Sequence, residues 1–572
     1  MINYKELISA LLAEIIEGLG PQEILGMVES PADSKLADYA FPCFRLAKAM
    51  RKPPAAIAKE IAGKLAANKI FERVESVNAY VNMFMNRSIF THEVLSETAR
   101  AKDRYGSSDI GQNRKVIVEY SSPNIAKPFH IGHIRSTVIG NAIYKLYDFL
   151  GFDTVRINHL GDYGTQFGKM IVSYRHWGNK EDVEKSPIQT LLGYYVKFHE
   201  ESEEDPSLED EARATFSRLE NGDPEETALW KWFRDESLRE FGRVYEMLGI
   251  DFDSYAGESF YSDKMGRVLS ELTEKGLLVE SEGAKIVDLS EYELPPALIT
   301  KKDGSTLYIT RDIAAAIYRK EHYDFYKNLY IVASQQNLHF QQWIKVVSLM
   351  GYDWAENCIH IPFGLVSLDE GTMSTRHGRV IFLEDVLNKA IDRTREIILE
   401  KNVNTDNIDA TAKQVGIGAV IFNELSNGRI KDYVFSWDKV LNFDGETGPY
   451  VQYTYARTAS VLRNAGEAGE KAVIECDTVD MKYILSDSAY ELVRLIYEFP
   501  DKVVEAAEKY EPSIVTRQIV DIAQSFNRFY HNEHILAEDE NEKKAKLLLT
   551  FSAGQTIRNG LLLLGMEVPE RM

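Results

Sequence analysis

A short apolar strand, a loop that contains two histidines and a long helix form the segment that most constrains the fold. Residues Lys115–Tyr120 are β-branched and apolar, which is typical of a buried strand. The segment Pro123–His133 follows and ends in His130-Ile-Gly-His133. Apolar residues then recur at helical spacing from Ile134 to Leu150, and Gly151 ends the helix. This order predicts a strand-to-helix connection that carries functional side chains.

The histidine loop has the chemistry of a phosphate site. Backbone amides at a helix start attract anions, and Gly132 allows a ligand to approach the backbone closely. His130 and His133 supply imidazoles that donate to phosphate oxygens as charge builds on them. Two histidines three residues apart also occur at surface positions and in metal sites, so the pair alone decides nothing. Its place between strand and helix favours the phosphates of a nucleotide.

The pattern of elements along the chain predicts an α/β protein with several domains. Strand and helix patterns alternate within residues 112–380, which predicts a Rossmann-like, doubly wound parallel sheet. Charged helices at about 190–245 interrupt this alternation as an insertion. Residues 1–105 mix helices and strands as an α+β domain. The pattern is helical over 381–440 and again over 441–572, where we expect a C-terminal α-helical bundle.

Composition limits the location and the partners. The 572 residues are too many for a single hydrophobic core, so we expect several domains. No apolar run is long enough to span a bilayer, and the first residues lack the pattern of a signal peptide. We therefore expect a cytoplasmic protein that does not bind a membrane. Three scattered cysteines predict neither disulfides nor a zinc site. A net charge of −22 argues against nucleic acid unless basic residues gather locally. The C-terminal candidates for such a stripe are Arg457, Arg463, Arg528 and Arg558.

A second motif, Gly371-Thr-Met-Ser-Thr-Arg-His-Gly378, together with the histidine motif resembles the two signatures of class I aminoacyl-tRNA synthetases. Several separate segments narrow the resemblance to the arginyl-tRNA synthetase family. They are Ser121–Lys127, His159–Phe167, Ala333–Gln336 and Leu564–Met572. The likeness extends over nearly the whole chain, and matches in several well-separated segments are specific.

The resemblance implies that ATP activates L-arginine to arginyl-adenylate, with release of pyrophosphate, before transfer to the 3′ end of tRNA(Arg). It implies catalytic roles for His130, His133, Lys127, Ser374 and Arg376, and ATP contacts for His130, Gly132, His133 and Met373. Mg²⁺ is expected to bind with ATP and to have no protein ligand. Asp162, Gly164 and Gln166 are adenosine contacts or residues that only shape their loop.

The chain departs from the class pattern in the second signature. Thr372 and Thr375 stand where the class has lysines, and Arg376 follows them. Guanidinium and ammonium groups do not bind phosphate equivalently. Some arginyl enzymes lack the loop lysine, and a lysine just before the histidine motif is thought to replace it. Our hypothesis is that Lys127, in that position here, supplies the cation.

Recognition of arginine requires carboxylates that face a planar guanidinium fork. The resemblance assigns this role to Glu258, Tyr308 and Asp312, and contacts with the α-amino group to Asn124 and Gln336. Alternatives remain: Asp312 would also stabilise the first turn of a helix, and Glu258 would also suit a solvated loop. The match to both surrounding motifs favours the functional interpretation.

The resemblance also divides the chain by contacts with tRNA. It assigns the tRNA elbow to residues 1–105, stem contacts to 381–440 and the anticodon to 441–572. The candidate tRNA contacts are Tyr80, Asn82, Tyr453, Tyr530 and Arg457. We expect a monomer. The alternatives are a catalytically silent tRNA-binding paralogue and a nucleotidylyltransferase of the same superfamily.

Overall fold

The structure is a computed structural model of the chain. It describes residues 2–31, 36–302, 307–367, 381–400, 407–440 and 445–572. These residues form two compact units. The first unit contains residues 1–105, 457–499 and 521–557, and the second contains 106–456, 500–520 and 558–572.

The N-terminal part of the first unit is an antiparallel sheet with helices. Its strands are β1 (Tyr39–Pro42), β2 (Phe71–Val77) and β3 (Tyr80–Met85), in the order β1-β3-β2. Its longer helices are α1 (Tyr4–Ile15), α4 (Pro54–Leu65) and α5 (Arg87–Ala101). Successive residues of β3 point to opposite faces, so Val81, Met83 and Met85 are buried while the residues between them are half-buried. The predicted α+β domain is confirmed.

Helices form the C-terminal part of the chain, as predicted. They are α18 (Gly448–Ala465), α19 (Glu467–Ile474), α20 (Asp487–Glu508), α21 (Ser513–Asn532) and α22 (Glu540–Leu563). The sequence predicts that Pro500 ends or kinks its helix. Helix α20 continues through Pro500, so the proline does not end it. A proline removes only one backbone donor, and tertiary packing offsets that loss here.

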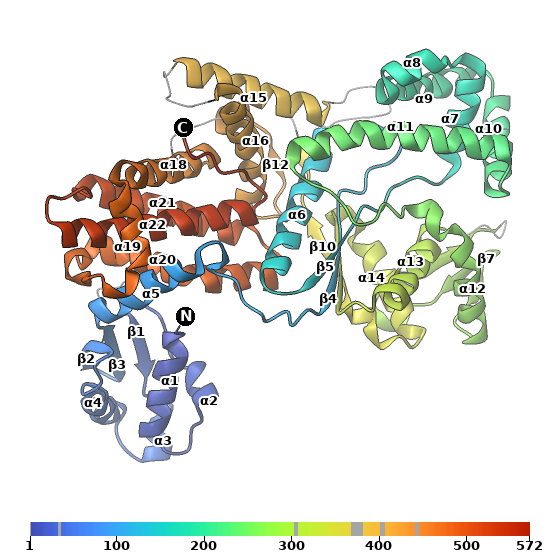
Figure 1. Cartoon of the computed structure of the whole chain (residues 1–572). Helices are drawn as coiled ribbons and strands as arrows, with labels where there is room; N and C mark the ends of the chain where they lie inside the picture. Colours follow the sequence, from blue (N-terminus) through green and yellow to red (C-terminus); the bar gives the residue numbers. More distant parts are fainter. Residues whose placement is uncertain (1, 32–35, 303–306, 368–380, 401–406, 441–444) are drawn as a thin grey trace. The chain divides into compact units, whose positions relative to one another are not determined.

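A parallel sheet is the centre of the second unit. Its strands are β4 (Lys115–Glu119), β5 (Asp153–Ile157), β9 (Lys327–Ala333) and β10 (Cys358–Phe363), in the order β10-β9-β4-β5. All three strand pairs are parallel. Helix α6 (Ile134–Phe149) connects β4 to β5 and lies beside the sheet (Figure 1). The order in which the chain adds strands to the sheet reverses between β4 and β9. Open α/β sheets bind ligands at such a point.

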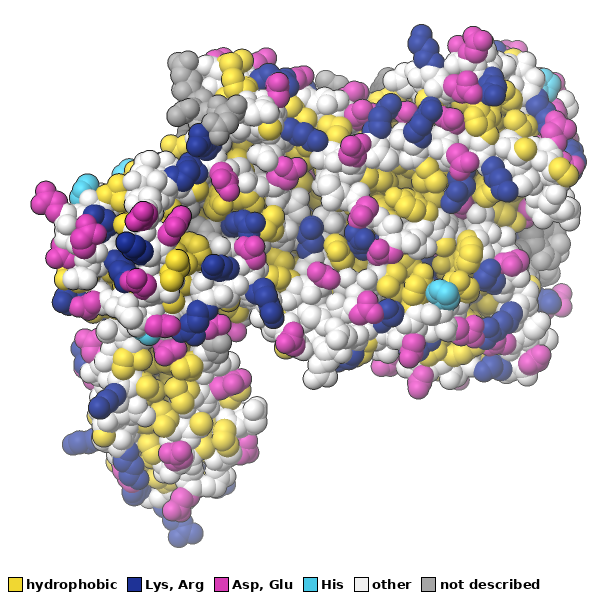
Figure 2. All heavy atoms as spheres, viewed as in Figure 1, with side chains coloured by type: hydrophobic (Ala, Val, Ile, Leu, Met, Phe, Trp, Pro, Cys, Tyr) yellow, Lys and Arg dark blue, Asp and Glu magenta, His cyan; other side chains and the backbone are white. Residues whose placement is uncertain are grey.

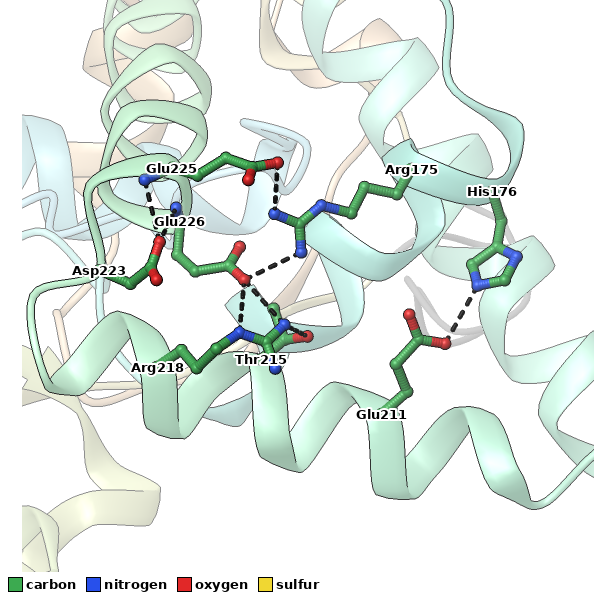
Figure 3. Close-up of polar contacts among 8 residues, drawn as sticks. All are labelled: Arg175, His176, Glu211, Thr215, Arg218, Asp223, Glu225 and Glu226. Atoms are coloured by element: carbon green, nitrogen blue, oxygen red, sulfur yellow. Dashed lines mark hydrogen bonds and ion pairs between the residues drawn. The ribbon is translucent and has the colours of Figure 1, made fainter.

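The segment between β5 and β9 contains a helical insertion. Its helices are α7 (Thr165–Trp177), α8 (Lys180–Lys185), α9 (Pro187–Glu204), α10 (Ser207–Glu220) and α11 (Pro224–Leu248). Figure 3 shows how charged side chains join α7, α10 and α11. The buried Glu226 carboxylate of α11 accepts from Arg175 of α7 at 2.9 Å and from Arg218 of α10 at 3.0 Å. Two guanidinium groups compensate the cost of burying this carboxylate. Asp223 caps α11 by accepting from two of its first amides.

A small antiparallel sheet and two helices complete the surroundings of the parallel sheet. The antiparallel strands β6 (Val279–Ser281), β7 (Ala284–Val287) and β8 (Ala297–Thr300) precede helix α13 (Tyr308–Tyr323). Helix α14 (Asn337–Leu349) connects β9 to β10. Ile117 of β4, Ile313 of α13 and Trp343 of α14 are fully buried in one core. Burial of this apolar surface fixes α13 and α14 against the sheet.

Charge is distributed rather than gathered on the face that Figure 2 shows. Lysine and arginine side chains are interspersed with aspartate and glutamate over both units. Arg528, a candidate for a basic stripe, is paired with Glu491 at 2.8 Å. Among the described residues, no helix combines the length and the apolar character that a bilayer-spanning helix requires.

Candidate active site

The carboxyl edge of the parallel sheet carries the residues predicted to hold the α-amino group of the amino acid. Asn124 lies in the loop after β4, and Gln336 lies between β9 and α14. Both side chains are exposed. A backbone bridge fixes the Asn124 loop to Gly161. A Cβ atom at Gly161 would lie 2.1 Å from Asn124 Oδ1, so a larger residue there would displace this amide from its present position.

The two histidines of the signature are in contact with each other. They lie at the ends of a 3₁₀ turn that leads into α6, with ring centroids 4.1 Å apart. His130 Nδ1 accepts from the Gly132 amide at 3.0 Å, and His133 Nδ1 accepts from the His130 amide at 3.2 Å. The Gly132 amide is therefore occupied by His130 and is not a free anion donor.

Burial decides the protonation of this pair. It lowers the pKa of His130 to about 4 and the pKa of His133 to about 3. Both rings are therefore neutral at pH 7. Because His130 Nδ1 accepts an amide proton, the ring proton of His130 lies on Nε2. His133 Nδ1 lies 3.2 Å from the His130 amide and 3.3 Å from the His130 carbonyl oxygen, so these contacts allow either tautomer of His133. The site thus offers two neutral imidazoles to a nearby ligand.

Lys127 lies near the histidine pair. Its charge adds to the effect of burial and of His130 in lowering the pKa of His133. The lysine side chain is half-buried. An ammonium group beside two neutral imidazoles is an arrangement that suits an anionic ligand.

The chain that follows the second signature pairs with the histidine segment. The Ile131 amide donates to the Ile381 carbonyl at 3.1 Å, and the Leu383 amide donates to the Phe129 carbonyl at 2.9 Å. These bonds place Phe382, which follows the signature in the chain, beside His130. Met373, Ser374 and Arg376, which the sequence assigns to catalysis and ATP binding, lie outside the described residues.

Arg135 joins the histidine helix to the strands that flank the second signature. No motif in the sequence predicts a role for Arg135. Its guanidinium is fully buried and donates to the carbonyls of Gly364 at 2.9 Å and Lys431 at 2.7 Å. Gly364 precedes strand β11 (Val366–Ser367), which ends four positions before Gly371, the first residue of the second signature. Glu424 of α16 (Ile408–Ser426) lies 3.6 Å from Arg135; burial raises the pKa of its carboxyl to about 8, and Arg135 opposes this rise.

We predict that Glu424→Gln lowers the stability of the second unit. The substitution removes the acid nearest to the buried Arg135 guanidinium, on which Asp432 and Glu511 also act, so we expect a cost of about 1–3 kcal/mol. Urea denaturation followed by fluorescence would show an earlier transition. Glu396→Gln is the matched control, since Glu396 is exposed and paired only with Arg393 on the surface. Equal transitions for the two variants would contradict the prediction.

Glu258 lies at the start of a 3₁₀ helix, Glu258–Lys264, and 18% of its side chain is exposed. Burial raises the pKa of its carboxyl to about 7, while Arg311 lowers it and Asp312 raises it. Arg311 Nη1 lies 3.2 Å from Glu258 Oε2. Glu258 is therefore a largely buried acid near other charges, and the alternative of a solvated loop acid is unsupported.

Asp312 lies one turn into α13, after Tyr308 at the first position of the same helix. Its carboxylate contacts His339 Nε2 at 2.5 Å. Tyr308 is 62% exposed, and Asp312 is half-buried. Arg311, the chain neighbour of Asp312, lies 3.2 Å from Glu258, so these two acids, distant along the chain, lie near each other.

Asp162 supports the Glu258 loop. It is fully buried, and it accepts from the amide and the hydroxyl of Ser259, both at 2.8 Å. Arg234 of α11 lies 3.4 Å from the same carboxylate. A Cβ atom at Gly257 would lie 2.7 Å from Asp162 Oδ1. These contacts favour the loop-shaping role over a contact with adenosine.

The candidate tRNA contacts are distributed over both units. Tyr80 and Asn82 lie on the half-buried face of β3 in the first unit. In the same unit, Arg457 lies over the Tyr530 ring at 5.1 Å and contacts Asn527. Tyr453, in the second unit, is 44% exposed. Among the described residues, no group of three or more His, Cys, Asp or Glu side chains is placed to hold a metal ion.

The parallel sheet, its ligand-binding edge and the neutral histidine pair define a class I aminoacyl-tRNA synthetase. The model for "tRNA synthetases class I (R), catalytic domain" matches residues 95–437. The models for the arginyl tRNA synthetase N-terminal domain and the DALR anticodon binding domain match residues 3–85 and 451–572. The chain belongs to the arginyl-tRNA synthetase family.

Relatives match over the full length. The arginine–tRNA ligase of Clostridioides difficile (strain 630) is 58% identical, and that of Halothermothrix orenii (strain H 168) is 55% identical. Each match covers 100% of both chains. The solved arginyl-tRNA synthetase of Thermus thermophilus is 25% identical with a TM-score of 0.81, over 100% of this chain and 99% of that one.

Proposed function

We propose that this chain is an arginine–tRNA ligase that joins L-arginine to tRNA(Arg) at the expense of ATP. Full-length identity of 58% to a relative of that name supports the activity. The structural observation that carries the choice of amino acid is the proximity of Glu258 and Asp312 in the unit that holds the histidine pair. Two carboxylates near each other suit a guanidinium group, which presents five donors in a plane.

In the first step, an arginine carboxylate oxygen attacks the α-phosphorus of ATP. A phosphorus–oxygen bond forms to give arginyl-adenylate, and the bond to pyrophosphate breaks. The enzyme aligns the reactants and stabilises the charge that develops on the phosphates. The ring N–H groups of His130 and His133 act as donors, with Gly132 beneath the nucleotide. Ser374, Arg376 and Met373 of the second signature contribute further contacts to ATP.

Mg²⁺ binds with ATP and is held by phosphate oxygens and water. In the second step, a hydroxyl of the terminal ribose attacks the arginyl carbonyl carbon, and AMP leaves. Neither step requires a protein nucleophile. The protein contributes position and charge stabilisation to both.

Arginine binds with its guanidinium at Glu258 and Asp312 and against the Tyr308 ring. Its α-amino group binds Asn124 and Gln336, which follow the carboxyl ends of neighbouring parallel strands. Buried partners of a guanidinium reject lysine, because an ammonium group leaves them unpaired, by about 10⁴-fold.

Contacts with tRNA extend over the rest of the chain. Residues 1–105 contact the tRNA elbow through Tyr80 and Asn82, and 381–440 contact the acceptor stem. Residues 441–572 contact the anticodon through Tyr453, Arg457 and Tyr530, while 112–380 perform catalysis. Exposed aromatic rings support this division, because single-stranded bases stack on them. The enzyme acts as a cytoplasmic monomer.

We predict that Lys127→Ala lowers the rate of adenylate formation by about 10²-fold, because a positioned cation stabilises the phosphates in the transition state. Single-turnover formation of arginyl-adenylate measures this rate. Lys127→Arg is the informative companion, since it keeps the charge and changes the geometry. Wild-type adenylation by Lys127→Ala would remove Lys127 from the mechanism.

The activity itself is tested by pyrophosphate exchange into ATP with and without arginine and tRNA(Arg). Exchange that requires arginine, and that tRNA stimulates, supports the proposal. Exchange without any amino acid would favour a nucleotidylyltransferase, and no exchange with all substrates would favour a silent tRNA-binding protein. Family members often require tRNA for activation, so the decisive reaction contains it.

A further inference from the structure

A resident guanidinium lies within the proposed arginine site. Arg311 precedes Asp312 on α13, and only 7% of it is exposed. Its Cζ atom lies 4.7 Å from the centre of the Tyr163 ring and 5.6 Å from that of Tyr308. Its Nη1 atom lies 3.2 Å from Glu258 Oε2. Arg311 therefore contacts two of the side chains assigned to the substrate.

The surroundings of Arg311 favour a permanent position over a temporary one. Two aromatic rings flank the guanidinium, an arrangement that stabilises a buried cation. Leaving this position would lose both contacts between the cation and the rings, which costs free energy. The ion pair uses one oxygen of Glu258. A carboxylate has two oxygens and about four lone-pair sites, so Glu258 keeps acceptor capacity for a ligand beside Arg311 and the Tyr163 backbone amide.

Charge balance supports the same conclusion. Glu258 and Asp312 carry two negative charges when ionised, and Arg311 carries one positive charge. The guanidinium of a bound arginine would bring the sum to zero. Arg311 also repels that guanidinium, so its benefit must come through Glu258. The benefit would be a carboxylate that is fixed in direction and kept ionised.

We propose that Arg311 is a positioning residue that sets the affinity for arginine by orienting Glu258 and holding it as a carboxylate. The inference rests on the proposed function, because it assumes that Glu258 binds the substrate guanidinium. Arg311 itself is not a catalytic residue.

The charges around Glu258 give this role a pH dependence. Burial raises the pKa of Glu258, and Arg311 is the cation that opposes the rise. Asp312 on the same helix as Arg311 raises the pKa further, and so does Asp162, whose own partner is Arg234. A backbone hydrogen bond from Tyr163 lowers it. Without Arg311, Glu258 would therefore ionise only at higher pH.

The first test compares Arg311→Gln with the wild type. Arginine affinity is measured by calorimetry, and the arginine KM by tRNA-stimulated pyrophosphate exchange, both from pH 6 to pH 9. We expect Arg311→Gln to raise the arginine KM at pH 7 by about fivefold, because a rise of one unit from a pKa of about 7 lowers the ionised fraction of Glu258 from about one half to about one eleventh. The defect should shrink as pH rises, because Glu258 then ionises without help. Arg311→Lys should restore part of the affinity at pH 7, and the ATP KM should stay unchanged.

A matched control separates this role from a general effect on α13. Arg267 also forms an ion pair with this helix, through Glu321 at 2.7 Å, but on the surface. Arg267→Gln should leave the arginine KM at the wild-type value at every pH. Folding of each variant is checked through the ATP KM. A lower arginine KM in Arg311→Gln would show that repulsion dominates and would overturn the proposal, as would a defect that does not change with pH.

A double-mutant cycle distinguishes this inference from the proposed function. Glu258→Gln should weaken arginine binding strongly, and adding Arg311→Gln should have no further effect if Arg311 acts through Glu258. The same fold-loss in both backgrounds would overturn the inference while Glu258 remains a ligand. Unchanged arginine binding in Glu258→Gln would overturn the assignment of Glu258 itself, and the role of Arg311 with it.

Discussion

His133→Ala is expected to lower the rate of arginyl-adenylate formation by about 10²–10³-fold, which corresponds to about 2.7–4 kcal/mol. The substitution removes one of two N–H donors aimed at charge that develops on the phosphates. It also leaves the His130 amide without the acceptor that it has at 3.2 Å. Single-turnover adenylation with saturating ATP and arginine measures the effect.

Two further results make this prediction specific. The pKa values of about 4 and 3 keep both rings neutral, so the rate should not follow a histidine titration between pH 6 and pH 8. His176→Ala is the matched control, because His176 lies in the insertion and is paired with Glu211 at 3.0 Å (Figure 3). A loss below tenfold in His133→Ala, or a rate that falls with deprotonation near pH 6.5, would contradict donation by neutral histidines.

Asp312→Ala is expected to raise the arginine KM by about 10²-fold and to leave the ATP KM nearly unchanged. A hydrogen bond to a charged group contributes about 1.5–3 kcal/mol, and the substitution also leaves His339 without its partner at 2.5 Å. Initial rates of pyrophosphate exchange, with each substrate varied in turn, separate the two constants.

Asp324→Ala provides the comparison for this prediction. Asp324 lies at the other end of α13, is exposed and is paired with Lys320 at 2.7 Å. Both KM values should keep their wild-type values in that variant. Small and equal changes of the arginine and ATP KM in Asp312→Ala would refute the assignment of Asp312 to the guanidinium.

Element types were predictable from the sequence where apolar periodicity is strong. The sequence pattern predicts a strand over Lys115–Tyr120 and a helix over Leu383–Leu399, and strand β4 and helix α15 (Leu383–Glu400) lie within a residue of these bounds. The pattern also predicts a helix over Leu547–Leu564, but α22 begins earlier, at Glu540, because its first turns are polar and show no apolar face. The signal that would have found this start is Asp539, whose side chain accepts from the amides of Asn541 and Glu542 at 2.9 Å.

The candidate site was predictable only in part. The place of the histidine motif between strand and helix predicted His130, and the family resemblance predicted Glu258 and Asp312. Arg311 stands inside the same Leu-Tyr-Ile-Thr-Arg-Asp segment and was missed, since nothing in the segment shows that it faces Glu258. Arg135 was missed for the same reason, as its partners lie 229 and 296 positions further along the chain.

The amino-acid sequence by itself determined the class of fold, the signature residues and the family. Only the tertiary structure decided the state of those residues: the position of the ring proton of His130, the use of Asp162 as a support and the pairing of Glu258 with Arg311. The physical reason is that motifs follow local order along the chain. Protonation and pairing depend instead on burial and on charges brought near from distant positions, and folding alone sets both.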